Sequence, residues 1–71
     1  MKFSEKLIYS RALLNITQAQ LSNYLKVSFS TINRWETEKT KPTKKSIMAF
    51  EIFCKSHKIL FENEDKKWMQ L

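Results

Sequence analysis

The sequence predicts a compact all-α domain of four to five helices. Apolar residues recur three or four positions apart in several segments, a spacing that places them on one face of a helix. Serine or threonine stands just before several of these segments, where its hydroxyl can cap a helix start. A chain of 71 residues has room for one domain with one core.

The first helix is expected at about residues 4–14, with Ser4 as its N-cap and with Leu7 and Leu14 turned to the core. Arg11 follows Leu7 by four positions and therefore lies on the same side of the helix. An arginine that faces inward needs a partner for its charge.

The second helix has the clearest start in the chain. Thr17 followed by Gln20 fits a capping box, and Ile16 and Leu21 stand where a hydrophobic staple would form. Leu21 and Leu25, four positions apart, form the expected buried face.

A third helix follows after a very short turn. Only Lys26 and Val27 precede the next N-cap, Ser28, so the two helices must cross steeply, as in helix-turn-helix units. Ile32 and Trp35 give the third helix its buried stripe. Its other side is free, and the start of such a helix can enter the major groove of DNA.

The stretch from about Arg11 to Pro42 resembles the Cro and lambda-repressor-like helix-turn-helix family, often called the Xre family. Its pattern of Thr-Gln-x-x-Leu, Val-Ser, Trp-Glu and a basic loop ending in proline is supplied by Thr17, Gln18, Leu21, Val27, Ser28, Ile32, Trp35, Glu36, Lys39, Lys41 and Pro42. The resemblance implies a lambda-repressor-like fold, double-stranded DNA as the partner, and an ion pair between Arg11 and Glu36. The alternative is two independent solvated charges, because surface ion pairs are common and weak.

Three positions depart from the family pattern. Lys26 and Glu38 stand where the family usually has glycine, and Ser22 replaces an alanine at the helix crossing. The chain contains no glycine at all. A left-handed Lys26 costs about 1 kcal/mol, so we expect these changes to affect the turn geometry more than the fold.

Base contacts are expected at the start of the recognition helix, from Phe29, Ser30, Asn33 and Arg34. Arg34 can donate two hydrogen bonds to guanine, Asn33 can pair with adenine, and Phe29 can rest against a thymine methyl group. Packing on the neighbouring turn is the alternative for Phe29. A solvated helix face is the alternative for Asn33.

Phosphate contacts are expected from donors at helix starts, Gln18 and Thr31, and from a basic loop with Lys39, Lys41 and Lys44. Thirteen Lys and Arg against seven Asp and Glu give a net charge of +6, which favours a polyanionic partner. The alternative for the three lysines is a solvated cluster.

A fourth helix is expected from Thr43 to about His57. Its apolar stripe is formed by Ile47, Phe50, Ile52, Phe53 and Cys54. Residues 1–57 then make up the helix-turn-helix domain. In the C-terminal segment 58–71, apolar residues accompany an acidic run, and a fifth packed helix and a dimerisation tail remain alternatives.

Neither catalysis nor a cofactor is expected. Cys54 and His57 supply at most two metal ligands where a tetrahedral site needs four, and the single histidine has no nucleophile and acid beside it. No segment reaches the roughly 18 apolar residues that cross a membrane, and the start of the chain lacks a secretory signal. We therefore expect a cytoplasmic protein that binds no membrane.

These observations predict sequence-specific binding of double-stranded DNA, by a transcriptional regulator or by the targeting module of a defence or mobile-element system. The alternative is a protein-interaction module with the same fold. RNA is less favoured, because an aromatic sheet platform for unpaired bases is missing. A homodimer on half-sites about 34 Å apart would bind more tightly than a monomer, and the sequence leaves the oligomeric state open.

Overall fold

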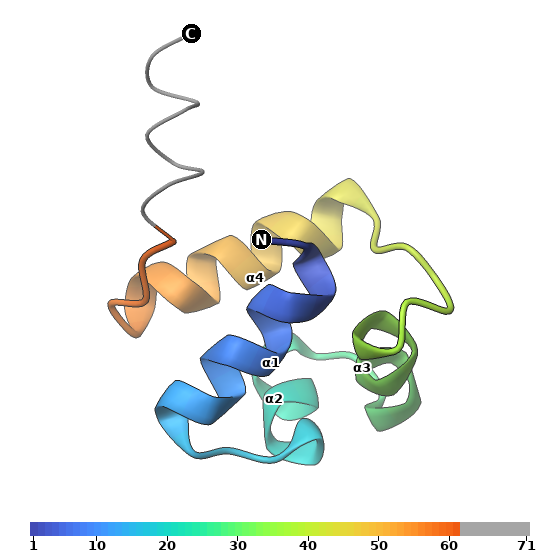
Figure 1. Cartoon of the computed structure of the whole chain (residues 1–71), viewed down its shortest axis with the longest axis horizontal. Helices are drawn as coiled ribbons and strands as arrows, with labels where there is room; N and C mark the ends of the chain where they lie inside the picture. Colours follow the sequence, from blue (N-terminus) through green and yellow to red (C-terminus); the bar gives the residue numbers. More distant parts are fainter. Residues whose placement is uncertain (62–71) are drawn as a thin grey trace, which may run out of the picture.

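The computed structural model describes residues 1–61, which form four helices and no strand. The helices are α1 (Phe3–Leu14), α2 (Gln18–Leu25), α3 (Phe29–Glu36) and α4 (Lys44–Ser56). In Figure 1, α1, α2 and α3 form the lower part of the molecule and α4 crosses above them. The predicted all-α class is confirmed. The predicted C-terminal segment, a fifth helix or a dimerisation tail, spans residues 58–71. Its residues 58–61 are not helical, and Ile59 is buried in the core. Residues 62–71 lie outside the described residues.

The starts of α2, α3 and α4 follow the predicted capping signals. The Thr17 hydroxyl accepts the Gln20 backbone N–H at 3.1 Å, and the Gln20 side chain accepts the Thr17 N–H at 2.8 Å, which completes the capping box. Ser28 and Thr43 cap α3 and α4 in the same way, each through the N–H group three residues on. Local side-chain chemistry therefore sets three of the four starts.

The start of α1 differs from the prediction that Ser4 is the N-cap, which is wrong. The N-cap is Lys2, whose backbone N–H donates to the Glu5 carboxylate at 2.7 Å. Phe3 extends the helix because its ring packs edge-on against two core aromatic rings. Ser4 is consequently buried, and its hydroxyl donates to Glu38, two residues after the end of α3.

The turn between α2 and α3 adopts the left-handed conformation expected at a glycine position. Lys26 has a φ of 58°, and the next residue, Val27, donates its N–H to the Ser22 carbonyl at 3.0 Å. The Ser22 side chain is buried at this crossing. The family's turn geometry is therefore kept without its glycine and alanine.

One core joins all four helices. Its buried members are Leu7, Leu21, Leu25, Ile32, Trp35, Phe50, Phe53, Cys54 and Ile59. Each fully buried leucine or isoleucine contributes about 1.5–3 kcal/mol relative to its exposed state. The prediction that Ile52 widens the apolar stripe of α4 is wrong, since it lies about 200° around the helix from Phe50 and is 66% exposed.

Candidate nucleic-acid interface

Helix α3 is held to the domain by its apolar side. Ile32 is completely buried and Trp35 nearly so, and the Trp35 ring meets the Phe3 ring edge-on at 5.5 Å between centroids. Eight residues are too few to form a stable helix alone, so these contacts keep α3 helical. The opposite side of α3 faces solvent.

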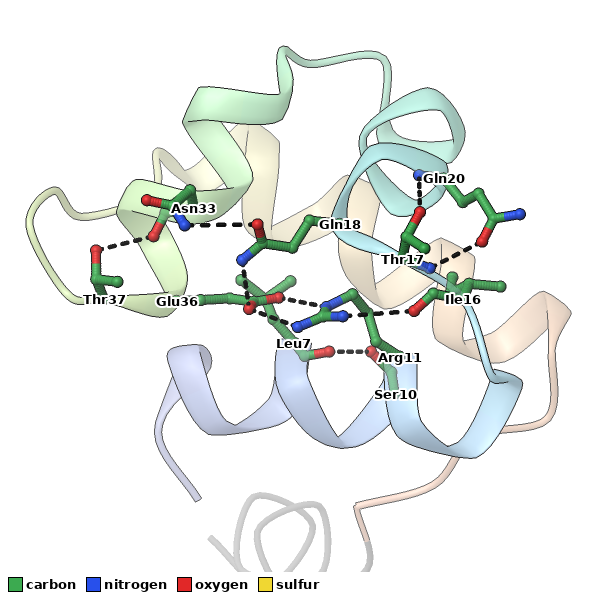
Figure 2. A network of polar contacts seen from close by, with 10 residues as sticks. All are labelled: Leu7, Ser10, Arg11, Ile16, Thr17, Gln18, Gln20, Asn33, Glu36 and Thr37. Atoms are coloured by element: carbon green, nitrogen blue, oxygen red, sulfur yellow. Dashed lines mark hydrogen bonds and ion pairs between the residues drawn. The ribbon is translucent and has the colours of Figure 1, made fainter.

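An ion pair fastens the end of α3 to α1. Arg11 donates from Nε to Oε2 of Glu36 at 2.7 Å and from Nη2 to Oε1 at 2.8 Å, a two-point contact drawn in Figure 2. The Glu36 side chain is 5% exposed and the Arg11 side chain 23%. The hydrogen bond to Glu36 raises the pKa of Arg11, against the lowering effect of burial. The resemblance to the Xre family implied this pair, which joins residues from opposite ends of the motif.

Gln18, in the first turn of α2, extends the ion pair into a network that also includes Asn33 of α3. Its Nε2 donates to Glu36 at 2.8 Å, and its Oε1 accepts a hydrogen bond from Nδ2 of Asn33 at 3.4 Å (Figure 2). Asn33 is half-buried, so it is not a freely solvated residue. Gln18 keeps one side-chain N–H, and the first turn of α2 adds backbone N–H groups that have no partner within the helix.

The outer edge of α3 carries Phe29, Ser30 and Arg34, all exposed. Phe29 is 54% exposed, so most of its ring does not pack on the neighbouring turn. Within residues 1–61, no hydrogen bond or ion pair holds the Arg34 side chain. The Ser30 hydroxyl lies 3.1 Å from that of Ser28, the helix cap.

The residues expected to bind phosphate lie at two places. Thr31 is half-buried in the first turn of α3, where its hydroxyl lies 2.8 Å from that of Ser28. Lys39 and Lys41 are exposed in the loop that follows α3, and Lys44 is exposed at the start of α4. In the described part of the chain no acidic side chain pairs with these three lysines.

The structure therefore divides the expected site residues into those that belong to one hydrogen-bonded network and those that lie outside it. Arg11, Gln18, Asn33 and Glu36 form one network. The other expected residues lie on the outer edge of α3, in its first turn, or in and after the loop behind it. Sequence reasoning missed the bonds from Gln18 to both Glu36 and Asn33, although the implied pair of Arg11 with Glu36 placed a carboxylate near the start of α2.

Two other kinds of site find no support in the described residues. Between residues 1 and 61, no helix combines the length and apolar character needed to span a membrane. The same residues contain no group of three or more His, Cys, Asp or Glu side chains suited to a metal ion.

Comparison with known proteins identifies the fold family. The helix-turn-helix family model HTH_3 matches residues 7–57. The chain belongs to this family. This result confirms the resemblance to the Xre family and, with it, the lambda-repressor-like fold.

Two curated proteins that are similar to the chain are named as regulators of transcription. The chain is 33% identical over 69 residues to the HTH-type transcriptional regulator DicA of Escherichia coli (strain K12), covering 94% of this chain and 51% of that protein. It is 40% identical over 53 residues to the HTH-type transcriptional activator BcrR of Enterococcus faecalis, covering 75% of this chain and 26% of that protein. The chain thus spans about half the length of DicA and about a quarter of BcrR. No solved structure matches the chain.

Proposed function

We propose that this domain binds double-stranded DNA in a sequence-specific manner, with α3 in the major groove, and that it serves a transcriptional regulator. The observation that carries the proposal is the outer edge of α3, where Phe29, Ser30 and Arg34 are exposed on a helix whose inner side is fixed to the core. The names of the two relatives, a transcriptional regulator and a transcriptional activator, support the same role.

In this proposal base recognition comes from the first turns of α3. Arg34 donates two hydrogen bonds to guanine, Phe29 contacts a thymine methyl group, and Ser30 bonds to either kind of base edge. Asn33 keeps its Oδ1 and one N–H after bonding to Gln18, which are the acceptor and donor that adenine requires. The network holds this amide in one orientation before DNA arrives.

Phosphate contacts position the domain on the duplex. Gln18 and Thr31 provide donors at the starts of α2 and α3, while Lys39, Lys41 and Lys44 provide positive charge next to α3. The net charge of +6 strengthens the attraction at low salt.

Fluorescence anisotropy with a labelled duplex of mixed sequence tests the proposal. Between 50 and 200 mM salt we expect the logarithm of the affinity to fall linearly with the logarithm of the salt concentration, with a slope of about −3 for the three lysine contacts with phosphate. The uncharged donors Gln18 and Thr31 release no counterions and add nothing to this slope. Absence of binding at micromolar protein and low salt would contradict the proposal and favour a protein-interaction module.

Selection from random duplexes tests specificity and the number of copies bound. A defined consensus is expected, because the base contacts discriminate among sequences. Two inverted half-sites about 34 Å apart would indicate a homodimer on DNA, and a single half-site would indicate a monomer. Sedimentation at several protein concentrations, with and without residues 62–71, gives the oligomeric state of the free protein and keeps the core residue Ile59 in both forms.

A further inference from the structure

Glu38 occupies a conformation that glutamate does not favour. Its φ is 62°, in the left-handed region. Directly after α3, its N–H donates to the Trp35 carbonyl at 3.2 Å, and the N–H of Lys39 donates to the Arg34 carbonyl at 2.9 Å. These two bonds close the helix in a pattern that usually places glycine at the left-handed position, because a side chain there is sterically penalised. A glutamate at this position therefore needs a compensating contact.

The Glu38 carboxylate has such a contact with α1. The Ser4 hydroxyl donates to Oε2 of Glu38 at 2.8 Å, across 34 positions of sequence. Ser4 is buried in the first turn of α1, so the carboxylate is fastened to a fixed point of the fold. Lys2 adds a charge contact, with Nζ 3.7 Å from Oε1.

We propose that Glu38 is a positioning residue for the basic loop that follows α3. Its bond to Ser4 fixes the direction in which the chain leaves α3, and thereby the placement of Lys39 and Lys41 against the phosphates beside the groove. The inference rests on the proposed DNA binding. A carboxylate next to phosphates repels them, so positioning and charge alone predict changes of opposite sign when Glu38 is replaced.

Three variants exploit this difference in sign. Glu38→Gly removes the tether and a negative charge, and we expect it to bind a mixed-sequence duplex about fivefold more weakly at 0.15 M salt, with a salt slope flatter by about one unit. Ser4→Ala leaves every charge in place and should have the same effect. Glu38→Gln keeps an acceptor for the Ser4 hydroxyl and should bind at least as tightly as the wild type.

Glu51→Gln is the matched control for charge, since it removes one negative charge from the exposed face of α4. If Glu38→Gly binds DNA as tightly as this control, or if Ser4→Ala leaves the salt slope unchanged, the proposal is overturned. Thermal melts of all four variants show which of them remain folded under the conditions of the binding assay.

Hydrogen exchange tests the tether without DNA. The Lys39 amide, bonded to the Arg34 carbonyl, should exchange about tenfold faster in Ser4→Ala. The Ile47 amide, bonded to the Thr43 carbonyl, is the internal reference and should not change. If the wild-type chain binds no DNA, the proposed function fails, and the Lys39 exchange rate still decides whether Ser4 and Glu38 fix the loop. An unchanged rate would refute that role.

Discussion

The two edges of α3 differ in how completely their side chains are partnered. On the inner edge, Ile32 and Trp35 are buried and Glu36 accepts hydrogen bonds from two residues. On the outer edge, Phe29 and Arg34 project into solvent. The contacts of the inner edge hold α3 in place. The residues of the outer edge are not needed for this, so they can make the proposed contacts with DNA. Substitutions on the inner edge should therefore change stability, and those on the outer edge DNA binding.

Asn33 lies between the two edges and connects them. Its Nδ2 bonds to Gln18, which in turn bonds to Glu36. Within residues 1–61, every buried side-chain nitrogen and oxygen has a hydrogen-bond partner. The polar network therefore stabilises the fold and also orients one of the proposed base contacts.

The largest effect is expected from Arg11→Ala, on the inner edge. It leaves the buried Glu36 carboxylate without its charged partner, which should lower the free energy of unfolding by about 3 kcal/mol. Urea denaturation at pH 7 measures this change. Arg34→Ala is the control, and its effect on stability should stay within about 0.5 kcal/mol.

A double variant separates the ion pair from the packing around it. Arg11→Met combined with Glu36→Leu removes both charges at similar volume, and we expect it to recover most of the stability lost in Arg11→Ala. A double variant as unstable as Arg11→Ala would show that the buried charge is not the cause of the loss.

The second effect concerns the outer edge. Arg34→Ala should reduce discrimination between the selected site and random DNA by about 1–3 kcal/mol, because a two-point contact with guanine is lost. Anisotropy competition between the two duplexes measures it. Equal loss of affinity for both duplexes would mean that Arg34 contacts phosphate. The outer edge of α3 would then not read the bases through this residue.

Local signals in the sequence were enough to predict the helix starts and the buried residues of the inner edge. The caps at Thr17, Ser28 and Thr43 and the spacing of Ile32 and Trp35 predicted the helices, because each depends on residues only a few positions apart. The pair of Arg11 with Glu36 came from the family resemblance and not from spacing.

Contacts between distant segments were not predictable in the same way. Ser4 has the residue type of an N-cap, but a tertiary contact with Glu38 and the packing of Phe3 move the helix start. Ile52 is a different case, because its place about 200° around the helix from Phe50 follows from spacing alone, and the prediction weighed its apolar side chain over that spacing. The bond from Gln18 to Asn33 depends on the crossing of α2 and α3, which sequence spacing alone does not fix.

The third effect belongs to the loop. Lys41→Ala should weaken binding to the selected site and to random DNA equally, about fivefold at 0.15 M salt, and flatten the salt slope by about one unit. Lys55→Ala, an exposed lysine on α4, is the matched control. If both variants flatten the slope equally, the loop has no special role and net charge explains the binding.

The smallest effect should come from the turn between α2 and α3. Lys26→Gly removes the cost of a left-handed lysine but increases the entropy of the unfolded chain, so we expect a net gain of at most about 0.5 kcal/mol in the free energy of unfolding. Asn15→Gly, at a φ of 56°, should gain less, because asparagine tolerates this conformation.

Lys26 is outside the proposed phosphate contacts, so the salt slope of DNA binding should not change in Lys26→Gly. A flatter slope in Lys26→Gly would place the turn against DNA and extend the interface from α3 onto α2.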